Sequence, residues 1–207
     1  LLGFFGSLHP AFDSFGHFRV HLAIIVAILA LPLLATTHLV QAVSALVFAV
    51  AAFSTTTDTL NLIGLKTVHA AFEAKPADRA VYRLLQINLR FDNRTPEKVL
   101  SLIGRTTPDV VTLDEVSTMW DGKLDLLKSA YPYRVTCPRP NGVFGAAILS
   151  RRPFAQGTET HCFERGALAT ATVDFAGAEI DVAAIHLGWP WPFEQARQIA
   201  LLSPSIA

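Results

Sequence analysis

The sequence predicts an α/β domain that follows a membrane-spanning helical hairpin. This prediction depends on the uneven distribution of charged residues and on the alternation of strand and helix patterns after residue 80. Of the 207 residues, 51% are hydrophobic and 16% are charged, whereas about 25% charged residues are usual in a soluble domain. A single soluble domain therefore does not describe the whole chain.

Charged side chains are concentrated in the second part of the chain. Residues 1–72 hold four of the 34 charged side chains, and residues 73–207 hold the other 30. The second region is long enough for one modest domain with its own core. Because 17 basic residues balance 17 acidic residues, the overall charge does not predict non-specific nucleic-acid binding.

A run of 38 residues between Arg19 and Asp58 contains no Asp, Glu, Lys or Arg. One bilayer span needs about 20 helical residues, so this run predicts two transmembrane helices within residues 20–54. The arms are expected at Val20–Ala35 and Leu39–Ser54. A buried hairpin of a soluble protein is the alternative, but the first arm lacks the polar stripe that such a helix presents to water.

The segments on either side of the hairpin are expected to be irregular. Residues 1–19 predict a loop, with Leu1–Gly6 as the tail of an earlier span. Because the first residue is leucine and the last residues do not complete an element, we expect the chain to be part of a longer protein. Residues 55–80 predict a juxtamembrane linker, since Pro76 and its polar neighbours do not favour a helix. Residues 81–207 are then expected to form part of one domain.

The second region begins with the order strand, helix, strand. An apolar segment at residues 80–89 predicts a buried strand, and Thr95 followed by Pro96 predicts the start of a helix. Val110–Leu113 predicts the next strand. Further strands are expected at residues 133–137, 145–150, 167–175 and 179–187, with helices at residues 122–130 and 193–202. This order predicts a mixed-sheet α/β domain built of layers.

Three polar residues follow apolar strands: Asn88, Glu115 and His186. Ligand sites of α/β sheets collect where strands end. A carboxylate beside a buried strand has a large desolvation cost unless it is paired or binds a cation, so Glu115 is a candidate metal ligand. Asn88 is a candidate oxygen ligand for the same ion, and His186 is a candidate donor to a phosphoryl oxygen.

Each of these residues also has a purely structural interpretation. Glu115 can pair with a surface Lys or Arg, Asn88 can cap a turn, and His186 can be a hydrogen-bonded core histidine. Arg151, which follows the strand predicted at residues 145–150, can face a phosphate or remain a solvated side chain. Spacing alone does not decide between these interpretations.

The two cysteines, Cys137 and Cys162, have no CxxC spacing, so the sequence leaves their pairing open. With His161 and His186 they include residue types that bind zinc, but no pair has the short spacing of a zinc site. The aromatic segment Trp189–Pro192 can line a substrate cleft, contact lipid head groups or pack against the domain.

Taken together, these motifs resemble the endonuclease/exonuclease/phosphatase superfamily, which has the DNase I-like fold. The resemblance runs from about Tyr82 to Leu202. It rests on five segments in order, namely Leu85–Asn88, Pro108–Val116, Tyr131–Tyr133, Gly145–Pro153 and Ile185–Leu187, followed by Arg197 and Gln198. It implies the first half of a DNase I-like four-layer α/β sandwich.

The resemblance also implies hydrolysis of a phosphodiester or phosphomonoester that depends on Mg²⁺ or Mn²⁺. Glu115 would bind the metal, Asn88 would help to hold the metal or the phosphate, and His186 would contact the scissile phosphate. Arg151 is expected to help bind the substrate. Hard cations prefer oxygen ligands and lower the pKa of bound water, which agrees with these residue types.

Two departures from the family pattern are visible. Asp114 occupies the position where the family usually has Gln, so this residue either adds negative charge beside Glu115 or points away. The family's later Gly-Asp-Phe-Asn and Ser-Asp-His motifs do not occur in the 207 residues. We therefore expect these residues alone to be catalytically inactive.

The sequence thus predicts a membrane-anchored phosphoesterase in the bacterial inner membrane, with its catalytic domain on the extracytoplasmic side. The expected partners are the lipid bilayer and a phosphoester substrate, which is a lipid head group, a nucleic acid or a small phosphoester. No obligate protein partner is predicted. The alternative is a non-catalytic membrane-anchored binding domain with a degenerate sandwich.

Overall fold

The computed structural model describes residues 2–55, 80–140, 142 and 145–206. It contains two compact units. Leu1–Ala74 with Trp189–Ala196 is called here the hairpin unit, and Lys75–Gly188 with Arg197–Ala207 is called the sandwich unit. Nearly all of the linker predicted at residues 55–80 lies outside the described residues.

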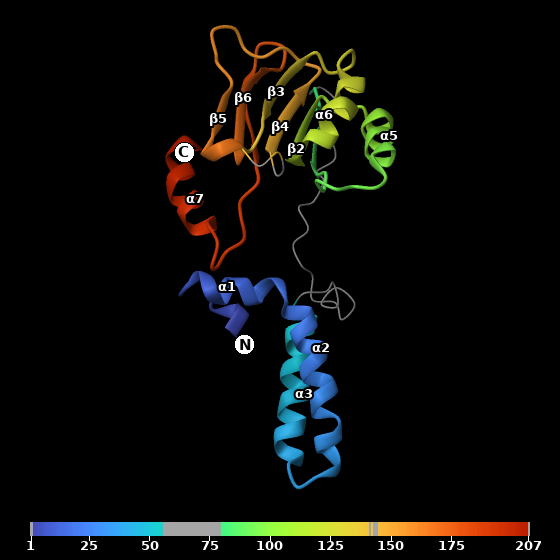
Figure 1. Ribbon diagram of the computed structural model, residues 1–207, viewed down its shortest axis with the longest axis vertical. Helices are drawn as coiled ribbons and strands as arrows, with labels where there is room; N and C mark the ends of the chain where they lie inside the picture. Colours follow the sequence, from blue (N-terminus) through green and yellow to red (C-terminus); the bar gives the residue numbers. More distant parts are fainter. Residues whose placement is uncertain (1, 56–79, 141, 143–144, 207) are drawn as a thin grey trace. The chain divides into compact units, whose positions relative to one another are not determined.

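Two neighbouring helices, α2 and α3, are the main elements of the hairpin unit (Figure 1). α2 spans Arg19–Ala30 and is followed by the 3₁₀ helix η2, Pro32–Ala35, while α3 spans Leu39–Ser54. The prediction of two helical arms joined at residues 36–38 is confirmed. Regular α-helix ends just before Pro32 because a proline ring clashes with the preceding turn and removes a backbone donor.

Small residues form the contact between α2 and α3. The buried residues of the two helices are all alanines, namely Ala23, Ala30, Ala42 and Ala49. Large apolar side chains face outward instead, and Ile28, for example, is 60% exposed. A helix pair in water has the opposite pattern, with its large apolar side chains packed inward. Close packing through small residues is typical of helices in membranes.

The helices of the hairpin unit are short compared with a bilayer span. Among the described residues, no single helix is both long and apolar enough to cross a bilayer. The segments Pro10–His17 and Arg19–Ala35 meet that requirement only as a pair, with a bend of 72° between them. α3 is a shorter apolar helix.

The N-terminal segment differs from the prediction of a loop over residues 1–19. The structure has a 3₁₀ helix η1 at Leu2–Phe4 and an α-helix α1 at Pro10–His17. α1 has its own start signal, because Pro10 lies in its first turn and the Nδ1 atom of His9 accepts a hydrogen bond of 3.1 Å from the N–H of Ala11. Histidine is not among the preferred N-cap residues, so the sequence pattern does not reveal this helix.

The first sheet of the sandwich unit has four strands in the order β1-β2-β4-β3. β1 (Leu84–Asn88) and β2 (Val110–Val116) are parallel, and the helix α5 (Pro96–Thr106) connects them. β4 (Gly145–Ser150) is antiparallel both to β2 and to β3 (Tyr133–Cys137). The predicted order strand, helix, strand is confirmed.

The second sheet is an antiparallel arrangement of β5, β6 and β7. β5 spans His161–Phe163, β6 spans Leu168–Asp174 and β7 spans Glu179–Ile185. β6 and β7 agree with the sequence prediction, but β5 is missed because so short a strand shows no alternating pattern. The remaining elements are α6 at Thr118–Leu124, η3 at Asp125–Leu127, η4 at Glu164–Gly166, α7 at Gln195–Leu202 and η5 at Ser203–Ser205.

Two buried clusters hold the layers of the sandwich unit together. Between the sheets, Ile148 of β4 belongs to one cluster with Val173 of β6. On the other face of the first sheet, Ile103 of α5 and Trp120 of α6 cluster with Leu113 of β2. The described part of this unit is therefore a mixed α/β fold in which helices α5 and α6 cover one face of the first sheet and the second sheet covers the other.

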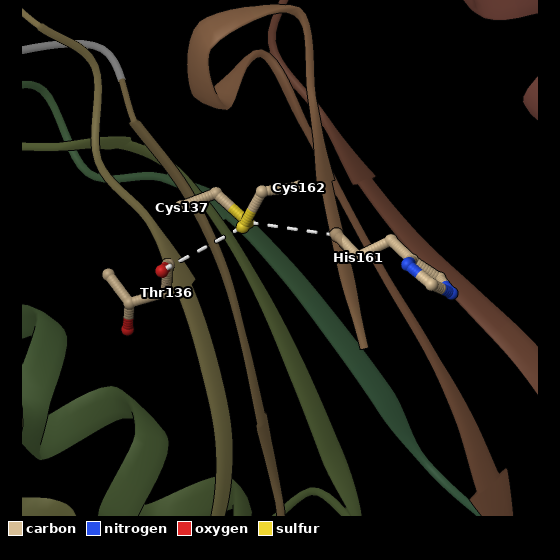
Figure 2. Close-up of a disulfide and its surroundings, with 4 residues drawn as sticks. All are labelled: Thr136, Cys137, His161 and Cys162. Atoms are coloured by element: carbon tan, nitrogen blue, oxygen red, sulfur yellow. Dashed lines mark hydrogen bonds between the residues drawn. A yellow bond between two sulfur atoms is a disulfide. The ribbon is translucent and has the colours of Figure 1, made fainter. Parts of the chain in front are cut away.

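A disulfide links β3 in the first sheet to β5 in the second. The bond joins Cys137 and Cys162, whose Cα atoms are 5.5 Å apart and which are separated by 25 residues in sequence. Figure 2 shows the two sulfurs between backbone carbonyls, with the carbonyl oxygen of Thr136 4.0 Å from the Sγ of Cys162 and that of His161 3.8 Å from the Sγ of Cys137. The pairing that the sequence leaves open is thus decided, and neither cysteine is a thiolate ligand for zinc.

Candidate functional site

The three predicted polar residues of the site lie close together in the sandwich unit. Asn88 is the last residue of β1, Glu115 lies near the end of β2, and His186 follows β7 directly. Asn88 lies opposite Asp114 in the parallel pair, so the carboxyl ends of β1 and β2 meet at one edge of the sheet. The structure therefore brings Asn88, Glu115 and His186 together.

A β-bulge controls the direction of the Glu115 side chain. The register of β2 against β4 shifts between Leu113 and Val116. Glu115 has a φ of 58°, a left-handed conformation that is uncommon for residues other than glycine. Side chains of a regular strand alternate between the two faces of the sheet, and a bulge interrupts this alternation and redirects a side chain. The Glu115 carboxylate owes its place at the strand end to this irregular backbone.

Two N–H donors hold the Glu115 carboxylate. The side-chain amide of Asn88 donates to Oε1 at 2.9 Å, and the backbone N–H of Phe91 donates to Oε2 at 3.1 Å. The Nε2 atom of His186 lies 3.9 Å from Oε1. The side chains of Glu115 and His186 are 17% and 21% exposed, so the group is sheltered but still in contact with solvent.

The loop after β1 is fixed against α6 and the residues before it. The backbone N–H of Arg90 donates to Oδ1 of Asn88 at 3.0 Å, which confirms the interpretation of Asn88 as a turn residue. The indole N–H of Trp120 donates to the carbonyl of Arg90 at 3.1 Å, and the hydroxyl of Ser117 donates to the carbonyl of Phe91 at 2.9 Å. Sequence reasoning does not identify Ser117 or Trp120, whose only signal is their position just after β2.

The backbone around His186 is also tied to buried groups. Its N–H donates to the carbonyl of Ala167 at 2.8 Å, next to the start of β6. The N–H of Gly188 donates to the side-chain oxygen of Gln198 at 2.7 Å, and Gln198 is buried. Sequence reasoning gives Gln198 no role beyond its part in the family resemblance. In the structure, its side chain supports the backbone at Gly188, two residues after His186.

Asp114 is buried next to the site. The residue is 7% exposed, and its Oδ2 accepts a hydrogen bond of 2.7 Å from the side-chain amide of Gln86. Among the described residues, its Oδ1 has no hydrogen-bond partner. Burial raises the pKa of the Asp114 carboxyl, the Glu115 carboxylate adds to the rise, and Gln86 and His186 oppose it. Gln86 shares a face of β1 with Asn88, since alternate strand residues point the same way.

The oxygen atoms of Glu115 and Asn88 suit a hard divalent cation that takes its other ligands from water or substrate. Each Glu115 oxygen accepts one of the two hydrogen bonds described above and keeps a lone pair. Oδ1 of Asn88 accepts from Arg90 and also keeps one. Mg²⁺ is commonly held by one or two carboxylates together with water and phosphate oxygens. In the part of the chain that the structure describes, no group of three or more His, Cys, Asp or Glu side chains is placed to hold a metal.

Arg151 lies apart from the other predicted site residues. It follows β4, whose last residue pairs with the first residue of β2, whereas Glu115 lies near the end of β2. The Arg151 guanidinium donates to the carbonyl of Thr107 at 3.2 Å. Because β2 and β4 are antiparallel, the structure does not bring Arg151 together with Glu115, Asn88 and His186.

Comparison with known proteins links the sandwich unit to one family. The sequence profile of the Endonuclease/Exonuclease/phosphatase family matches residues 85–203, which is more than half of the chain. No curated protein matches the chain. The match contains all of the site residues described above.

Solved structures with a similar fold include two TDP2 proteins and Nocturnin. TDP2 from D. rerio, complexed with single-strand DNA product, is 20% identical with a TM-score of 0.50, and the match covers 60% of this chain and 54% of that chain. Truncated TDP2 from Caenorhabditis elegans is 17% identical with a TM-score of 0.49, over 60% of this chain and 53% of that chain. The human Nocturnin catalytic domain with bound sulfate is 18% identical with a TM-score of 0.43, over 60% of each chain. The chain spans about half the length of the TDP2 structures.

Asp114 gives the folded chain a pH dependence that can be measured. Because burial raises its pKa, the folded chain keeps a proton over a pH range, above the ordinary value of 3.8, in which the unfolded chain has lost it. Stability due to this group therefore falls as the pH rises through that range. Asp114→Asn removes the charge, so the stability of the variant relative to the wild type should rise between about pH 3 and about pH 7.

Urea denaturation at each pH measures this difference. The exposed Asp121→Asn is the matched control, and its stability relative to the wild type should stay nearly constant over the same range. A constant difference for Asp114→Asn as well would contradict the buried carboxyl described here.

Proposed function

Because the chain belongs to the endonuclease/exonuclease/phosphatase family, we propose that it forms part of the active site of a membrane-anchored, divalent-metal-dependent phosphoesterase. Members of this family are hydrolytic nucleases and phosphatases. The observation that carries the proposal is the convergence of side chains from β1, β2 and the end of β7. Asn88 donates to Glu115 at 2.9 Å, and His186 lies 3.9 Å from the same oxygen.

Glu115 is the proposed metal ligand. The amide of Asn88 and the N–H of Phe91 hold its carboxylate in one orientation, which lowers the entropy cost of binding a cation. When bound, Mg²⁺ or Mn²⁺ neutralises phosphoryl charge and lowers the pKa of its water. Asn88 orients the carboxylate, and the remaining lone pair of its Oδ1 is the proposed second oxygen ligand.

His186 is the proposed contact to the phosphoryl group. An imidazole N–H is a suitable donor to a phosphoryl oxygen. The distance of 3.9 Å between His186 and Glu115 allows one phosphoryl group to reach both the imidazole and a cation on the carboxylate. The substrate contact predicted for Arg151 is not part of this proposal, because Arg151 lies beside the opposite end of β2.

The hairpin unit supports the proposed membrane anchor. Its helices pack through alanines and expose their large apolar side chains, an arrangement that lipid tails stabilise and water does not. A buried soluble hairpin, the alternative left by the sequence, needs other protein to cover these side chains. Among the described residues of the hairpin unit, large apolar side chains such as Ile24, Ile25 and Leu29 remain exposed.

Aromatic residues of the hairpin unit support the same location. Trp189 stacks on Phe18, with ring centroids 6.1 Å apart and an angle of 12° between the planes. The backbone N–H of Trp191 donates to the hydroxyl of Ser14 at 3.0 Å. Both tryptophan side chains remain exposed, and tryptophan is enriched at membrane–water interfaces. We therefore place this aromatic segment at the head-group level.

The disulfide supports an extracytoplasmic location for the sandwich unit. Disulfides persist in oxidising compartments and are rare in the cytosol, and Cys137 and Cys162 are bonded in this fold. This agrees with the bacterial inner membrane as the proposed location. A lipid head group is the proposed substrate because anchoring keeps the site near the bilayer. Nucleic acid is a second candidate for the same chemistry, since the similar D. rerio TDP2 was solved with a DNA product.

Removing the Glu115 charge should weaken metal binding. We expect Glu115→Gln to lower the Mn²⁺ affinity of the 207-residue chain by more than about tenfold, because even indirect supports of a metal site typically contribute that much. Calorimetric titration with Mn²⁺ measures the effect, and Glu159→Gln, an exposed carboxylate of the sandwich unit, is the matched control. Equal affinities of Glu115→Gln and the wild type would remove Glu115 from its proposed role and favour a non-catalytic binding domain.

The same preparation tests the activity of the chain by itself. The described site holds one proposed metal-binding carboxylate and one imidazole, and the later family motifs Gly-Asp-Phe-Asn and Ser-Asp-His do not occur in the sequence. We therefore propose that the 207 residues alone do not hydrolyse phosphodiesters. Mg²⁺-dependent hydrolysis of a phosphodiester by the purified wild-type chain would contradict this part of the proposal.

A charged side chain on the outer surface of α2 should prevent membrane insertion. Ile28 is 60% exposed, so Ile28→Arg costs little in water but about 2.5–3.5 kcal/mol at the centre of a membrane helix. We expect the variant to lose most of its association with phosphatidylcholine vesicles in a flotation assay. Leu126→Arg is the control, since Leu126 is 71% exposed on the sandwich unit, and it should float as the wild type does. Unchanged flotation of Ile28→Arg would exclude the membrane hairpin.

The location of the sandwich unit can be read from its cysteines. In intact bacterial cells that express the chain, we expect Cys137 and Cys162 to resist maleimide labelling until a reductant is added, because they form a disulfide. After reduction, a maleimide that does not cross the inner membrane should label Cys162, which is exposed, whereas Cys137 is buried. Labelling only after the inner membrane is permeabilised would place the domain in the cytoplasm, and labelling without reductant would contradict the disulfide.

A further inference from the structure

A cavity in the hairpin unit combines an apolar lining with one arginine. Its volume is about 310 Å³, and it is lined by residues of η1, α1, α2 and α3. In Figure 1, α1 lies near the end of the α2–α3 pair where α2 begins, and its direction differs from that of α2, in agreement with the 72° bend between the two segments. The apolar lining includes Phe4, Phe15, Leu22, Val26, Phe48 and Ala52.

Arg19 is the charged residue of this cavity, and its hydrogen bonding is incomplete. Its Nη2 donates to the carbonyl of Gly3 at 3.0 Å, and its guanidinium carbon lies 4.2 Å from the centre of the Phe4 ring. Its Nε is buried and has no hydrogen-bond partner in the part of the chain that the structure describes. A buried donor on a charged group costs free energy when it is unpaired, and an anionic acceptor in the cavity would remove this cost.

We propose that this cavity binds one anionic phospholipid, with its phosphodiester on Arg19 and an acyl chain along the apolar lining. The proposal rests on the membrane location of the hairpin unit proposed above. It adds a lipid site that is separate from the site at Glu115, because it lies wholly within the hairpin unit.

The charge and the position of Arg19 both favour an anionic phospholipid as the ligand of this cavity. The planar guanidinium matches the geometry of phosphate oxygens, while the apolar lining matches a hydrocarbon chain and offers few partners to a polar molecule. Arg19 also directly precedes the 38 uncharged residues of the hairpin, which places it at head-group depth if those residues enter the hydrocarbon core. Basic groups beside transmembrane helices bind anionic head groups in this way.

Lipid affinities of the 207-residue chain in detergent micelles test the proposal. Native mass spectrometry compares phosphatidylglycerol with phosphatidylcholine that has the same acyl chains, and inorganic phosphate is the third probe. We expect the wild type to bind phosphatidylglycerol at least about tenfold more tightly than phosphatidylcholine. Both lipids carry a phosphodiester, but the choline cation of phosphatidylcholine neutralises its charge and repels the guanidinium of Arg19. Inorganic phosphate should not compete at equal concentration, because it lacks the acyl chain.

Variants separate the two parts of the site. Arg19→Gln should remove the preference for phosphatidylglycerol, and Arg19→Lys should retain only part of it, since lysine keeps the charge but lacks the planar donors. Ala52→Leu should lower the affinity for phosphatidylglycerol without touching the charge, because the larger side chain fills the apolar part of the cavity. Arg105→Gln, an exposed arginine of α5 in the sandwich unit, is the matched control and should bind as the wild type does.

The lipid site would be overturned by equal affinities of the wild type for the two lipids, by an unchanged preference in Arg19→Gln, or by an unchanged affinity for phosphatidylglycerol in Ala52→Leu. Flotation of the wild type and of Arg19→Gln with phosphatidylcholine vesicles distinguishes a failure of the lipid site from a failure of the membrane anchor. Flotation with no lipid preference in the wild type would reject the site alone, whereas absence of flotation in the wild type would reject both proposals.

Discussion

The hydrogen bonds that hold the Glu115 carboxylate are the contacts on which the rest of the candidate site depends. Glu115 is in a left-handed conformation, which costs free energy unless the surroundings compensate for it. The amide of Asn88 and the N–H of Phe91 provide that compensation, and both donors belong to the end of β1 and the loop after it. The parallel pairing of β1 and β2 brings these donors to the bulge. The sheet, the bulge and the loop are therefore one unit, and a change in any of them moves the carboxylate.

Asp114 is an incompletely paired acidic group at this edge of the sheet. One of its carboxyl oxygens accepts from Gln86, and the other has no partner among the described residues. Burial and the neighbouring Glu115 carboxylate both raise the pKa of this group. An additional cation or proton near Glu115 relieves the repulsion between the two carboxylates. The residue that departs from the family pattern thus strengthens the electrostatic case for a cation at this place.

In the hairpin unit, small side chains are buried and large apolar side chains are exposed, which is the opposite of the pattern in a soluble protein. Alanines form its inner contact, while isoleucine, leucine and valine side chains face outward. Apolar surface of this kind is unfavourable in water and neutral in hydrocarbon, so the surrounding medium decides whether the hairpin is stable. Arg19 stands at the boundary of this surface, with one guanidinium donor against Gly3 and another unpaired. The proposed anchor and the proposed lipid site therefore rest on the same distribution of side chains.

The sequence by itself determined the elements that depend on local pattern. The uncharged run indicated two helices, and strands β3 and β4 were predicted with the bounds that the structure has. It also determined the candidate residues Asn88, Glu115 and His186, because polar side chains after apolar strands stand out in a linear pattern. Helix α1 and strand β5 escaped prediction because a histidine cap and a very short strand have weak local signals. Only the tertiary structure decided the Cys137–Cys162 pairing, the contact of Gln86 with Asp114 and the separation of Arg151 from the site. Each of these depends on how strands that lie apart in sequence pair or pack against one another, and no local preference encodes that arrangement.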